Sequence, residues 1–258
     1  MGYRKLSLFH RIKSNIPLLS RSNILVYEGI FPDVGVPTAV NLAEDAVINA
    51  LACRVNYNSA SKELAVTACE PMHTLHRTWI KRELGRGLLS GSFLVNEWGA
   101  IDSTKEKSFD VFMASYQASW RQPEYYLKPR HQDLPTLVVE SGWAKTYPSL
   151  IRDKDLWLIG GSPHVNVVIV IEWSTSPRNR IRGRLEVYRR QSGVVQVESI
   201  FPEPSPGVFP QVIRLTRDEL FDKAKSPHRD PEEKIVFSVD RLREAARKAF
   251  HNVGFIPA

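Results

Sequence analysis

Residues 134–140 read Leu-Pro-Thr-Leu-Val-Val-Glu, and residues 165–171 read Val-Asn-Val-Val-Ile-Val-Ile. Both runs are largely apolar over the length of a strand, as expected in a sheet that is buried on both faces. Residues 147–159 between them have apolar side chains at helical spacing, with Pro148 in the first turn and Gly160-Gly161 after the end. This order of strand, helix and strand predicts two parallel neighbouring strands.

The rest of the chain predicts more helices and short strands around this unit. Helices are expected over 41–54, 72–85 and 240–250, the second ended by Gly85 and Gly87 and the third capped by Asp240. Short strands are expected at five further places: 92–96, 111–116, 125–128, 184–190 and 194–198. We therefore expect an α/β fold with a small mixed sheet flanked by helices. It forms one domain over 41–258, with its core at about 70–190, after a variable N-terminal arm over 1–40.

The composition is that of an ordinary globular protein with an excess of basic residues. The 258 residues include 35 Lys and Arg against 28 Asp and Glu, which gives a net charge of +7. A basic balance fits a nucleic-acid partner, although an excess of this size does not establish one. No apolar run approaches the roughly 20 residues that a membrane helix needs, so a membrane partner is not expected.

The cysteine content and the N-terminus bear on the compartment. Cys53 and Cys69 form no Cys-x-x-Cys pattern, which excludes a structural zinc ribbon. So few thiols favour a reducing, intracellular compartment. The basic, serine-containing N-terminus is faintly similar to a mitochondrial transit peptide, but a disordered or capping arm is the simpler interpretation. The cytoplasm, the nucleus and the mitochondrion therefore all stay open.

Two acids border strands of the predicted sheet. Glu124 follows a proline just ahead of the strand expected at 125–128, and Glu140 ends the strand expected at 136–140. Two carboxylates that meet at one sheet edge are the oxygen ligands that magnesium prefers, and such a site serves phosphodiester chemistry. Taken alone, each acid is more simply a solvated side chain or an ion-pair partner.

The segment around these acids has a recognisable pattern. It combines Arg121-Gln-Pro-Glu124 with Pro135-Thr-Leu-Val-Val-Glu140, a helical segment containing Asp153 and Trp157, and the apolar strand from Val165. This pattern resembles the PD-(D/E)XK phosphodiesterase superfamily, which has the restriction-endonuclease-like fold, and within it a set of fungal proteins. The resemblance covers about 70–190. It implies that the helix over 72–85 is the first core helix, that Glu124 and Glu140 hold Mg²⁺, and that Glu83 could supply a further acid.

Three positions depart from the superfamily pattern. The first acid is a glutamate rather than the usual aspartate, the lysine position two residues after Glu140 holds Gly142, and Ala144-Lys145 replaces a Ser-Glu pair. The resemblance implies a lysine that orients or activates the attacking water. Lys145, Lys128 and Arg121 are the candidates for this positive charge, and Lys145 is grouped with Glu124 and Glu140 as a candidate catalytic residue.

The densest basic stretch runs over 178–190. Period-two alternation would place Arg178, Arg180, Arg182 and Arg184 on one face of a strand, where they could contact phosphates. With Arg121 and Lys128, the last three are the candidate nucleic-acid-binding residues. A charged strand edge that prevents aggregation explains the pattern equally well.

Histidines and tryptophans have simpler explanations than ligand binding. His73 and His76 have the i, i+3 spacing of helical metal ligands, but without a matching ligand pair they are more simply surface or core residues. Trp143 and Trp157 are interpreted as packing residues rather than base-stacking platforms.

Two functions follow from these observations. The first is a magnesium-dependent phosphodiesterase or nuclease that acts on nucleic acid. The second is a catalytically degenerate relative that binds nucleic acid or a protein through the retained cleft. Close approach of Glu124 and Glu140 with a lysine nearby would favour the first, and an arginine or apolar side chain in that space would favour the second. A phosphate loop, a Gly-x-Ser-x-Gly elbow and a dinucleotide fingerprint are absent from the sequence. The substrate and the oligomeric state stay open.

Overall fold

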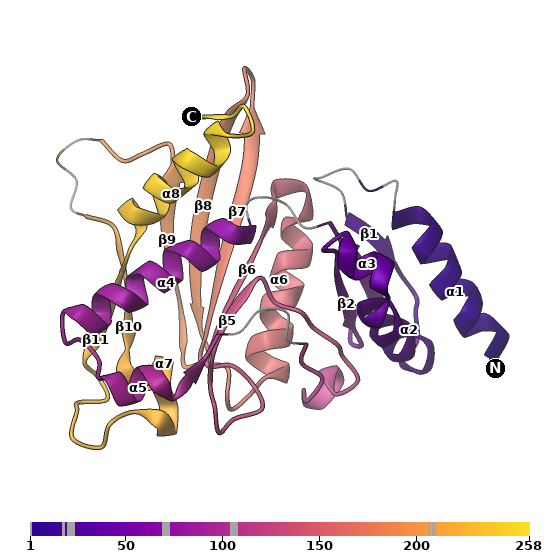
Figure 1. Ribbon diagram of the computed structural model, residues 1–258, viewed down its shortest axis with the longest axis horizontal. Helices are drawn as coiled ribbons and strands as arrows, with labels where there is room; N and C mark the ends of the chain where they lie inside the picture. The colour runs from indigo at the N-terminus through magenta and orange to yellow at the C-terminus, as the bar shows by residue number, and fades with distance from the viewer. Residues whose placement is uncertain are drawn as a thin grey trace. The chain divides into compact units, whose positions relative to one another are not determined.

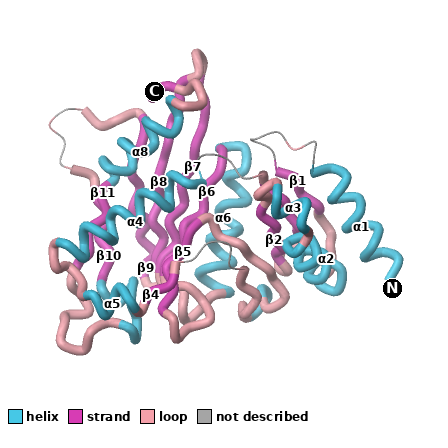
Figure 2. Tube along the Cα trace, viewed as in Figure 1, coloured by secondary structure: helices cyan, strands magenta, loops and turns pink. Residues whose placement is uncertain are grey.

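The computed structural model describes the chain except for residues 1, 17–18, 20–23, 69–72, 104–107, 206 and 208–209, and it omits the side chains of 2–7, 73–74, 145 and 194. The described chain is a mixed α/β protein (Figures 1 and 2). It separates into two compact units. Unit 1 comprises Met1–Glu70, Glu106–Gln122 and Ile159–Gly161, and unit 2 comprises Pro71–Lys105, Pro123–Leu158 and Ser162–Ala258.

Unit 1 is built from a three-stranded antiparallel sheet and helices. Its strands β1 (Ile24–Tyr27), β2 (Arg54–Asn58) and β3 (Glu63–Thr67) lie in the order β1-β3-β2. Its helices are α1 (Gly2–Asn15), α2 (Pro32–Glu44), α3 (Ala46–Ala50) and the 3₁₀ turn η2 (Ala114–Tyr116). Buried apolar side chains from α1, α2, α3, β2 and β3 form one core, among them Ile12, Leu42, Ile48, Val55 and Val66.

Unit 1 differs from the sequence expectation at three places. Residues 1–40 include α1, β1 and most of α2 rather than a structureless arm. The single helix expected over 41–54 is divided, because Asp45 has an extended backbone and its side chain accepts hydrogen bonds from the N–H groups of Val47 and Ile48, which starts α3. The strand expected over 111–116 is absent, because residues 111–113 are irregular and Ala114–Tyr116 form η2.

The division into units also differs from the expected single domain over 41–258. The segment Glu106–Gln122 returns to unit 1, where the backbones of Tyr57 and Trp120 pair in an isolated antiparallel bridge. The side-chain oxygens of Gln122 and Asn56 add bonds to the backbone N–H groups of Val55 and Gln122, respectively. These long-range contacts depend on tertiary structure, so local sequence patterns do not reveal them.

Unit 2 is organised around a seven-stranded mixed sheet. Its strands are β4 (Ile101–Asp102), β5 (Tyr125–Pro129), β6 (Leu137–Trp143), β7 (Val167–Ser176), β8 (Arg180–Arg189), β9 (Ser192–Phe201) and β12 (Ile256–Pro257). They lie in the order β12-β8-β7-β6-β5-β4, and β9 also pairs with β8. Strands β6 and β7 are parallel, as predicted, and α6 (Tyr147–Asp155) with the π-helical turn Leu156–Gly160 lies between them in the chain.

The remaining elements of unit 2 are helices and a separate hairpin. They are α4 (His73–Leu89), α5 (Val95–Gly99), the turn η3 (Ala144–Thr146), α7 (Arg217–Phe221), η5 (Asp222–Ala224), α8 (Val239–His251) and the antiparallel pair β10 (Val212–Thr216) and β11 (Lys234–Ser238). The prediction that Gly85 and Gly87 end α4 is wrong, because the helix continues to Leu89. The prediction of a strand over 92–96 is also wrong, because α5 begins within this segment. Glu97 accepts a hydrogen bond from the N–H of Leu94 and so starts α5. Helix α8 is capped by Ser238 rather than by Asp240.

The two faces of the large sheet carry different helices. Odd-numbered residues of β6 and β7, such as Val139 and Ile169, form one core with apolar residues of α4 and α8. Even-numbered residues face α6: Trp157 contacts Glu140, and Leu150 lies over Gly142. Helix α6 packs on β6 and β7 (Figure 1). Among the described residues, no helix is both long and apolar enough to cross a membrane.

A glycine in β8 tests this core directly. A Cβ atom on Gly183 would lie 2.4 Å from Cζ3 of Trp173 and 3.1 Å from Cβ of Ile200, and both of those side chains are fully buried. We expect Gly183→Ala to lower the free energy of unfolding by about 1–3 kcal/mol because the core is overpacked. Gly193→Ala is the control, since no atom lies within 4 Å of its Cβ position. Urea denaturation measures both, and equal stabilities would contradict the packing of Trp173 on β8.

Candidate functional site

The two candidate acids lie at neighbouring strands of the sheet: Glu124 immediately precedes β5, and Glu140 lies within β6. Strands β5 and β6 are antiparallel with Tyr125 opposite Val139, which brings Glu124 and Glu140 to the same end of this strand pair. Both side chains are buried, at 8% exposure for Glu124 and 2% for Glu140. The structure therefore brings this carboxylate pair to one end of the β5–β6 strand pair, where Glu140 faces α6.

Glu140 is held by a tryptophan. The indole Nε1–H of Trp157 donates a hydrogen bond of 2.8 Å to Oε1 of Glu140, and Trp157 is fully buried. The predicted packing role of Trp157 is confirmed, but its hydrogen bond to the carboxylate was not predicted from sequence. Spacing alone could not reveal it, because Trp157 lies in a π-helical turn whose geometry differs from that of an ordinary helix.

The carboxylate pair has the donor chemistry for a hard divalent cation. Magnesium is commonly bound by one or two carboxylates, with water or substrate phosphate completing its six ligands. Within the described part of the chain, no group of three or more His, Cys, Asp or Glu residues could hold a metal ion. A site at Glu124 and Glu140 is consequently a two-carboxylate site, rather than a cage made by the protein alone.

Glu83 is not brought to this pair. Its side chain is buried in α4, where Arg241 of α8 donates to both of its oxygens at 2.5 Å and the N–H of Ser238 donates at 2.9 Å. Helix α4 also packs on the face of the sheet opposite to the carboxylate pair. The structure thus corrects the expectation that Glu83 is a metal ligand, and it gives Glu83 the role of joining α4 to the start of α8.

Lys128 lies in β5, four residues after Glu124. Its ammonium donates to the carbonyl oxygens of Gln132 at 2.6 Å and Pro129 at 3.3 Å, so it holds the turn that follows β5. Lys128 is buried and is not a surface residue that contacts phosphates, which corrects that expectation.

The other two candidate cations are Arg121, which lies in unit 1, and Lys145, whose side chain is outside the described atoms. Arg121 belongs to unit 1, where it is buried and its backbone pairs with that of Phe109. Its low exposure does not fit the predicted contact with nucleic acid. The backbone of Lys145 lies in η3, shortly after β6, and its side chain is outside the described atoms.

The lysine position of the superfamily pattern is filled by other atoms. A Cβ atom on Gly142 would lie 2.7 Å from Oγ1 of Thr146 and 3.5 Å from the methyl groups of Leu150. Thr146 is itself fixed, since Oγ1 donates to the carbonyl oxygen of Trp143 at 2.7 Å. A lysine at position 142 would therefore displace the start of α6 rather than extend freely into the site.

A second buried glutamate, Glu186, lies on the same face of the sheet as Glu140, two strands away on β8. Register places Glu140 beside Val170 of β7, and Val170 opposite Glu186 of β8. Glu186 is 1% exposed and accepts hydrogen bonds from the hydroxyls of Tyr147 and Tyr188. Burial, followed by the hydrogen bond to Glu186, raises the pKa of both tyrosines. The cluster of Glu186, Tyr147 and Tyr188 fixes the first turn of α6 to the sheet. Its only signal in the sequence was the period-two alternation of β8.

Three arginines form a row on β8. Arg180, Arg182 and Arg184 are exposed and alternate with buried residues, as predicted. The expectation that Arg178 shares this face is wrong, because Arg178 lies before β8 in a turn, with a positive φ of 64°. Arg184 forms an ion pair with Glu186, and Arg180 donates to the carbonyl oxygen of Pro257. Among the described residues, Arg182 has no ion-pair partner. The Cα atoms of successive arginines in this row lie about 6.7 Å apart, because alternate residues of a strand are separated by twice the rise per residue.

The histidines of α4 do not join the carboxylate pair. His76 is fully buried, its Nδ1 lies 3.4 Å from Oγ of Ser141, and its ring stacks against Trp173. It therefore belongs to the core between α4 and the sheet, as the simpler interpretation held. The side chain of His73 lies outside the described atoms.

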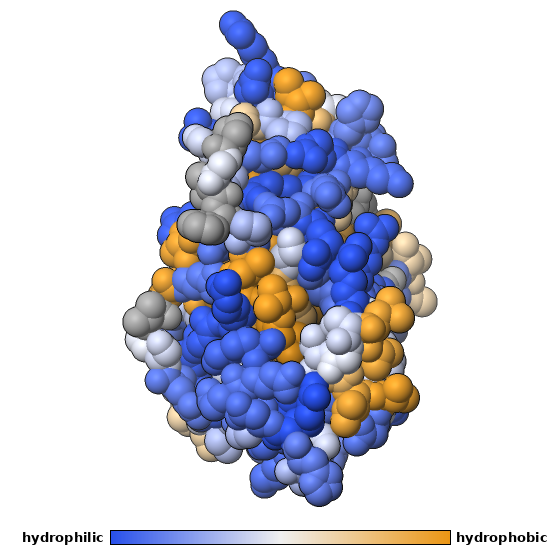
Figure 3. Space-filling model, turned by 90° about the vertical axis from the view of Figure 1, so that its left-hand side faces the viewer, coloured by the Kyte–Doolittle hydropathy of each residue, from blue (hydrophilic) through white to orange (hydrophobic). Residues whose placement is uncertain are grey.

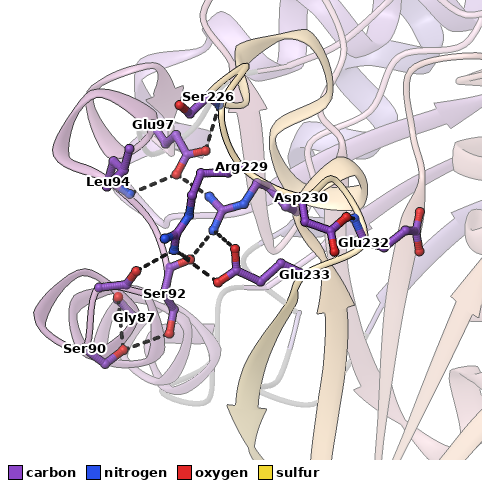
Figure 4. Close-up of polar contacts among 12 residues, drawn as sticks. Gly87, Ser90, Ser92, Leu94, Glu97, Ser226, Arg229, Asp230, Glu232 and Glu233 are labelled. Atoms are coloured by element: carbon purple, nitrogen blue, oxygen red, sulfur yellow. Dashed lines mark hydrogen bonds and ion pairs between the residues drawn. The ribbon is translucent and has the colours of Figure 1, made fainter.

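A buried ion-pair network lies apart from these groups. Glu97 of α5 and Arg217 of α7 are both fully buried and form an ion pair. Glu97 also accepts from the N–H groups of Leu94 and Ser226, while Arg229 and Glu233 pair beside it (Figure 4). Both oxygens of the Glu97 carboxylate accept from protein donors, so we assign the network a structural role.

Comparison with known proteins gives no assignment: no family model matches the chain, and no curated protein matches it significantly. The function is accordingly argued from the arrangement of the described side chains.

Proposed function

We propose that unit 2 is a restriction-endonuclease-like domain and that the protein is a divalent-metal-dependent phosphodiesterase of nucleic acid. The order of elements supports this proposal. Helix α4, strands β4, β5 and β6, helix α6 and strand β7 follow one another around a single sheet, with β6 and β7 parallel. This is the order of elements that the resemblance of the sequence to the PD-(D/E)XK superfamily implies.

The observation that carries the proposal is the carboxylate pair. Glu124 directly precedes β5, Glu140 lies in the neighbouring strand β6 at the same end of the pair, and both side chains are buried. Both residues are ligands that a hard cation selects. The pair therefore suits Mg²⁺ or Mn²⁺, which when bound would stabilise the charge that develops on a reacting phosphate.

The arginine row gives the proposed protein a surface for the nucleic-acid backbone. Arg180, Arg182 and Arg184 lie on the same face of the sheet as Glu140, on a strand that is two positions away. Exposed guanidinium groups bind phosphates by charge and by paired hydrogen bonds. We expect these residues to contribute affinity that falls with salt, and the carboxylates to contribute the chemistry.

Cleavage assays test the proposal. The wild-type protein is mixed with single- and double-stranded DNA and RNA in the presence of Mg²⁺ or Mn²⁺. We expect one of these polymers to be cut, and Glu140→Gln to reduce the rate on the order of 100-fold or more, because the charge that holds the cation is lost. Glu63→Gln, a change in unit 1, is the matched control and should keep the rate. Equal rates for Glu140→Gln and the wild type would overturn the assignment.

A second function, a catalytically degenerate binding module, is favoured by one observation. The space beside Gly142 is filled by Thr146 and Leu150, so the lysine of the superfamily pattern has no room there. Such a protein would bind nucleic acid with a salt-dependent affinity but cut none of the polymers. Arg182→Glu would then weaken binding while Glu140→Gln left it unchanged.

If this second function is protein binding, exposed apolar side chains of unit 2 offer a candidate contact surface. Exposed apolar side chains lie at the end of α4 and in α5, among them Leu89 at 89% and Val95 at 74% exposure. Figure 3 shows groups of apolar side chains set in a largely polar face. Exposed apolar groups of this kind are typical of protein contact surfaces.

A further inference from the structure

The contact between Trp157 and Glu140 joins the end of α6 to the carboxylate pair. Trp157 is fully buried, Glu140 is 2% exposed, and the indole N–H lies 2.8 Å from Oε1. The indole of tryptophan is a donor with a single N–H, so it fixes one oxygen in one direction. A hydrogen bond to a charged acceptor is also stronger than one between neutral groups.

The local backbone is unusual at this point. Helix α6 ends at Asp155, and the chain continues as a π-helical turn over Leu156–Gly160. A π turn contains an extra residue compared with an α-helical turn, and such turns are rare and often found at functional sites. The turn changes the direction of the side chains that follow, and here it accompanies an indole N–H that meets a carboxylate rather than a backbone carbonyl.

The character of the donor also matters. Glu83 and Glu97 are each held by an arginine, which supplies a positive charge to the carboxylate. Trp157 is neutral, so it orients Glu140 without adding charge. Hydrogen-bonded neighbours that orient metal ligands in this way commonly change metal affinity by 10–100-fold when they are replaced.

We infer that Trp157 is a positioning residue that fixes the carboxylate of Glu140 for a divalent cation. This inference rests on the proposed function, since it assigns Trp157 a role at the proposed metal site. The π turn Leu156–Gly160 presents the indole, and the indole sets the orientation of the carboxylate before the cation binds.

Calorimetric titration with MgCl₂ and MnCl₂ tests this role with Trp157→Phe, which keeps an aromatic ring and removes the N–H. We expect the dissociation constant of the metal to rise about 10–100-fold. The matched control is Trp79→Phe. Trp79 is equally buried and loses a comparable bond, the one its Nε1–H donates to the carbonyl oxygen of Ser238 at 2.9 Å. Its metal affinity should stay within about twofold of the wild type, because it lies on the other face of the sheet.

The outcomes separate this inference from the proposed function. Metal binding by the wild type with an unchanged affinity in Trp157→Phe would overturn the positioning role alone. No metal binding by the wild type would overturn both. Should Trp157→Phe fail to fold, the assigned indole ¹H–¹⁵N resonance of Trp157 in the wild type decides. It is expected to shift during the metal titration while that of Trp79 stays unchanged, and an unshifted Trp157 resonance would overturn the inference.

Discussion

Glu83→Ala is expected to lower the free energy of unfolding by about 2–3 kcal/mol, because it leaves the N–H of Ser238 and the partly exposed guanidinium of Arg241 without their acceptor. Glu83 is 1% exposed and receives two bonds from Arg241 and one from the N–H of Ser238. Burial lowers the pKa of Arg241, but the hydrogen bond from its guanidinium to Glu83, the largest influence, raises it. Loss of the carboxylate would therefore detach the start of α8 from α4.

Two variants make this result specific. Glu83→Gln keeps the size of the side chain and an oxygen that can accept a hydrogen bond, so it should lose less stability than Glu83→Ala. The partly exposed guanidinium of Arg241 then loses a charged partner but keeps a hydrogen-bond acceptor. Lys234→Ala, on the exposed side of β11, should change stability by no more than about 0.5 kcal/mol. Urea denaturation monitored by circular dichroism measures all three. A loss below about 1 kcal/mol for Glu83→Ala would contradict the structural role.

The second large effect is expected at Arg217. Arg217→Met removes a fully buried guanidinium that is paired with Glu97 and Glu233 and donates to the carbonyl oxygen of Ser92. We expect a loss of about 3–5 kcal/mol, because Glu97 stays buried without its cation. The double variant Arg217→Met with Glu97→Met should recover part of the loss, since no uncompensated charge is left. If the double variant is less stable than the single one, this account of the pair is wrong.

The same pair predicts how stability depends on pH. Burial raises the pKa of Glu97, but the hydrogen bonds from Arg217 and from the N–H groups of Ser226 and Leu94 outweigh it and hold this pKa below the ordinary value of 4.5. A lowered pKa in the folded state means that the contribution to stability is complete above about pH 4.5 and is lost as the pH falls through the folded value. Unfolding measured between pH 3 and pH 7 should show a smaller acid loss for Glu97→Gln than for the wild type. Parallel curves would contradict this prediction.

Much of the sheet could be predicted from sequence because its central strands are apolar over their whole length. Residues 137–139 and 167–171 lie between helices and are fully buried, so the sequence pattern and the environment agree. The failures fall where long-range contacts decide local structure. Helix α5 depends on Glu97, whose buried partner Arg217 is 120 residues away. The described apolar side chains within 1–40, such as Ile12 and Ala39, pack with β2 and β3, which no local pattern indicates.

The candidate site was predictable only in part for the same reason. The spacing of Glu124 and Glu140 relative to their strands indicated a pair, and the register of β5 and β6 brings them to the same end of the strand pair. Spacing did not indicate that Glu83 binds Arg241 or that Lys128 binds the carbonyl oxygens of its own turn. Nor did it reveal Trp157 as the donor to Glu140. These hydrogen bonds depend on which side chains meet between different helices and strands, and local sequence patterns carry no information on such contacts.

The proposed cation site at the carboxylate pair is tested most directly by calorimetric titration of the purified protein with MgCl₂ and MnCl₂. The account predicts saturable binding of one cation per chain, which Glu140→Ala abolishes while the fold, followed by circular dichroism, is retained. Glu83→Gln should bind the cation as the wild type does, because its carboxylate lies on the other face of the sheet. No binding by the wild type up to millimolar metal, or binding that survives Glu140→Ala, would contradict the account.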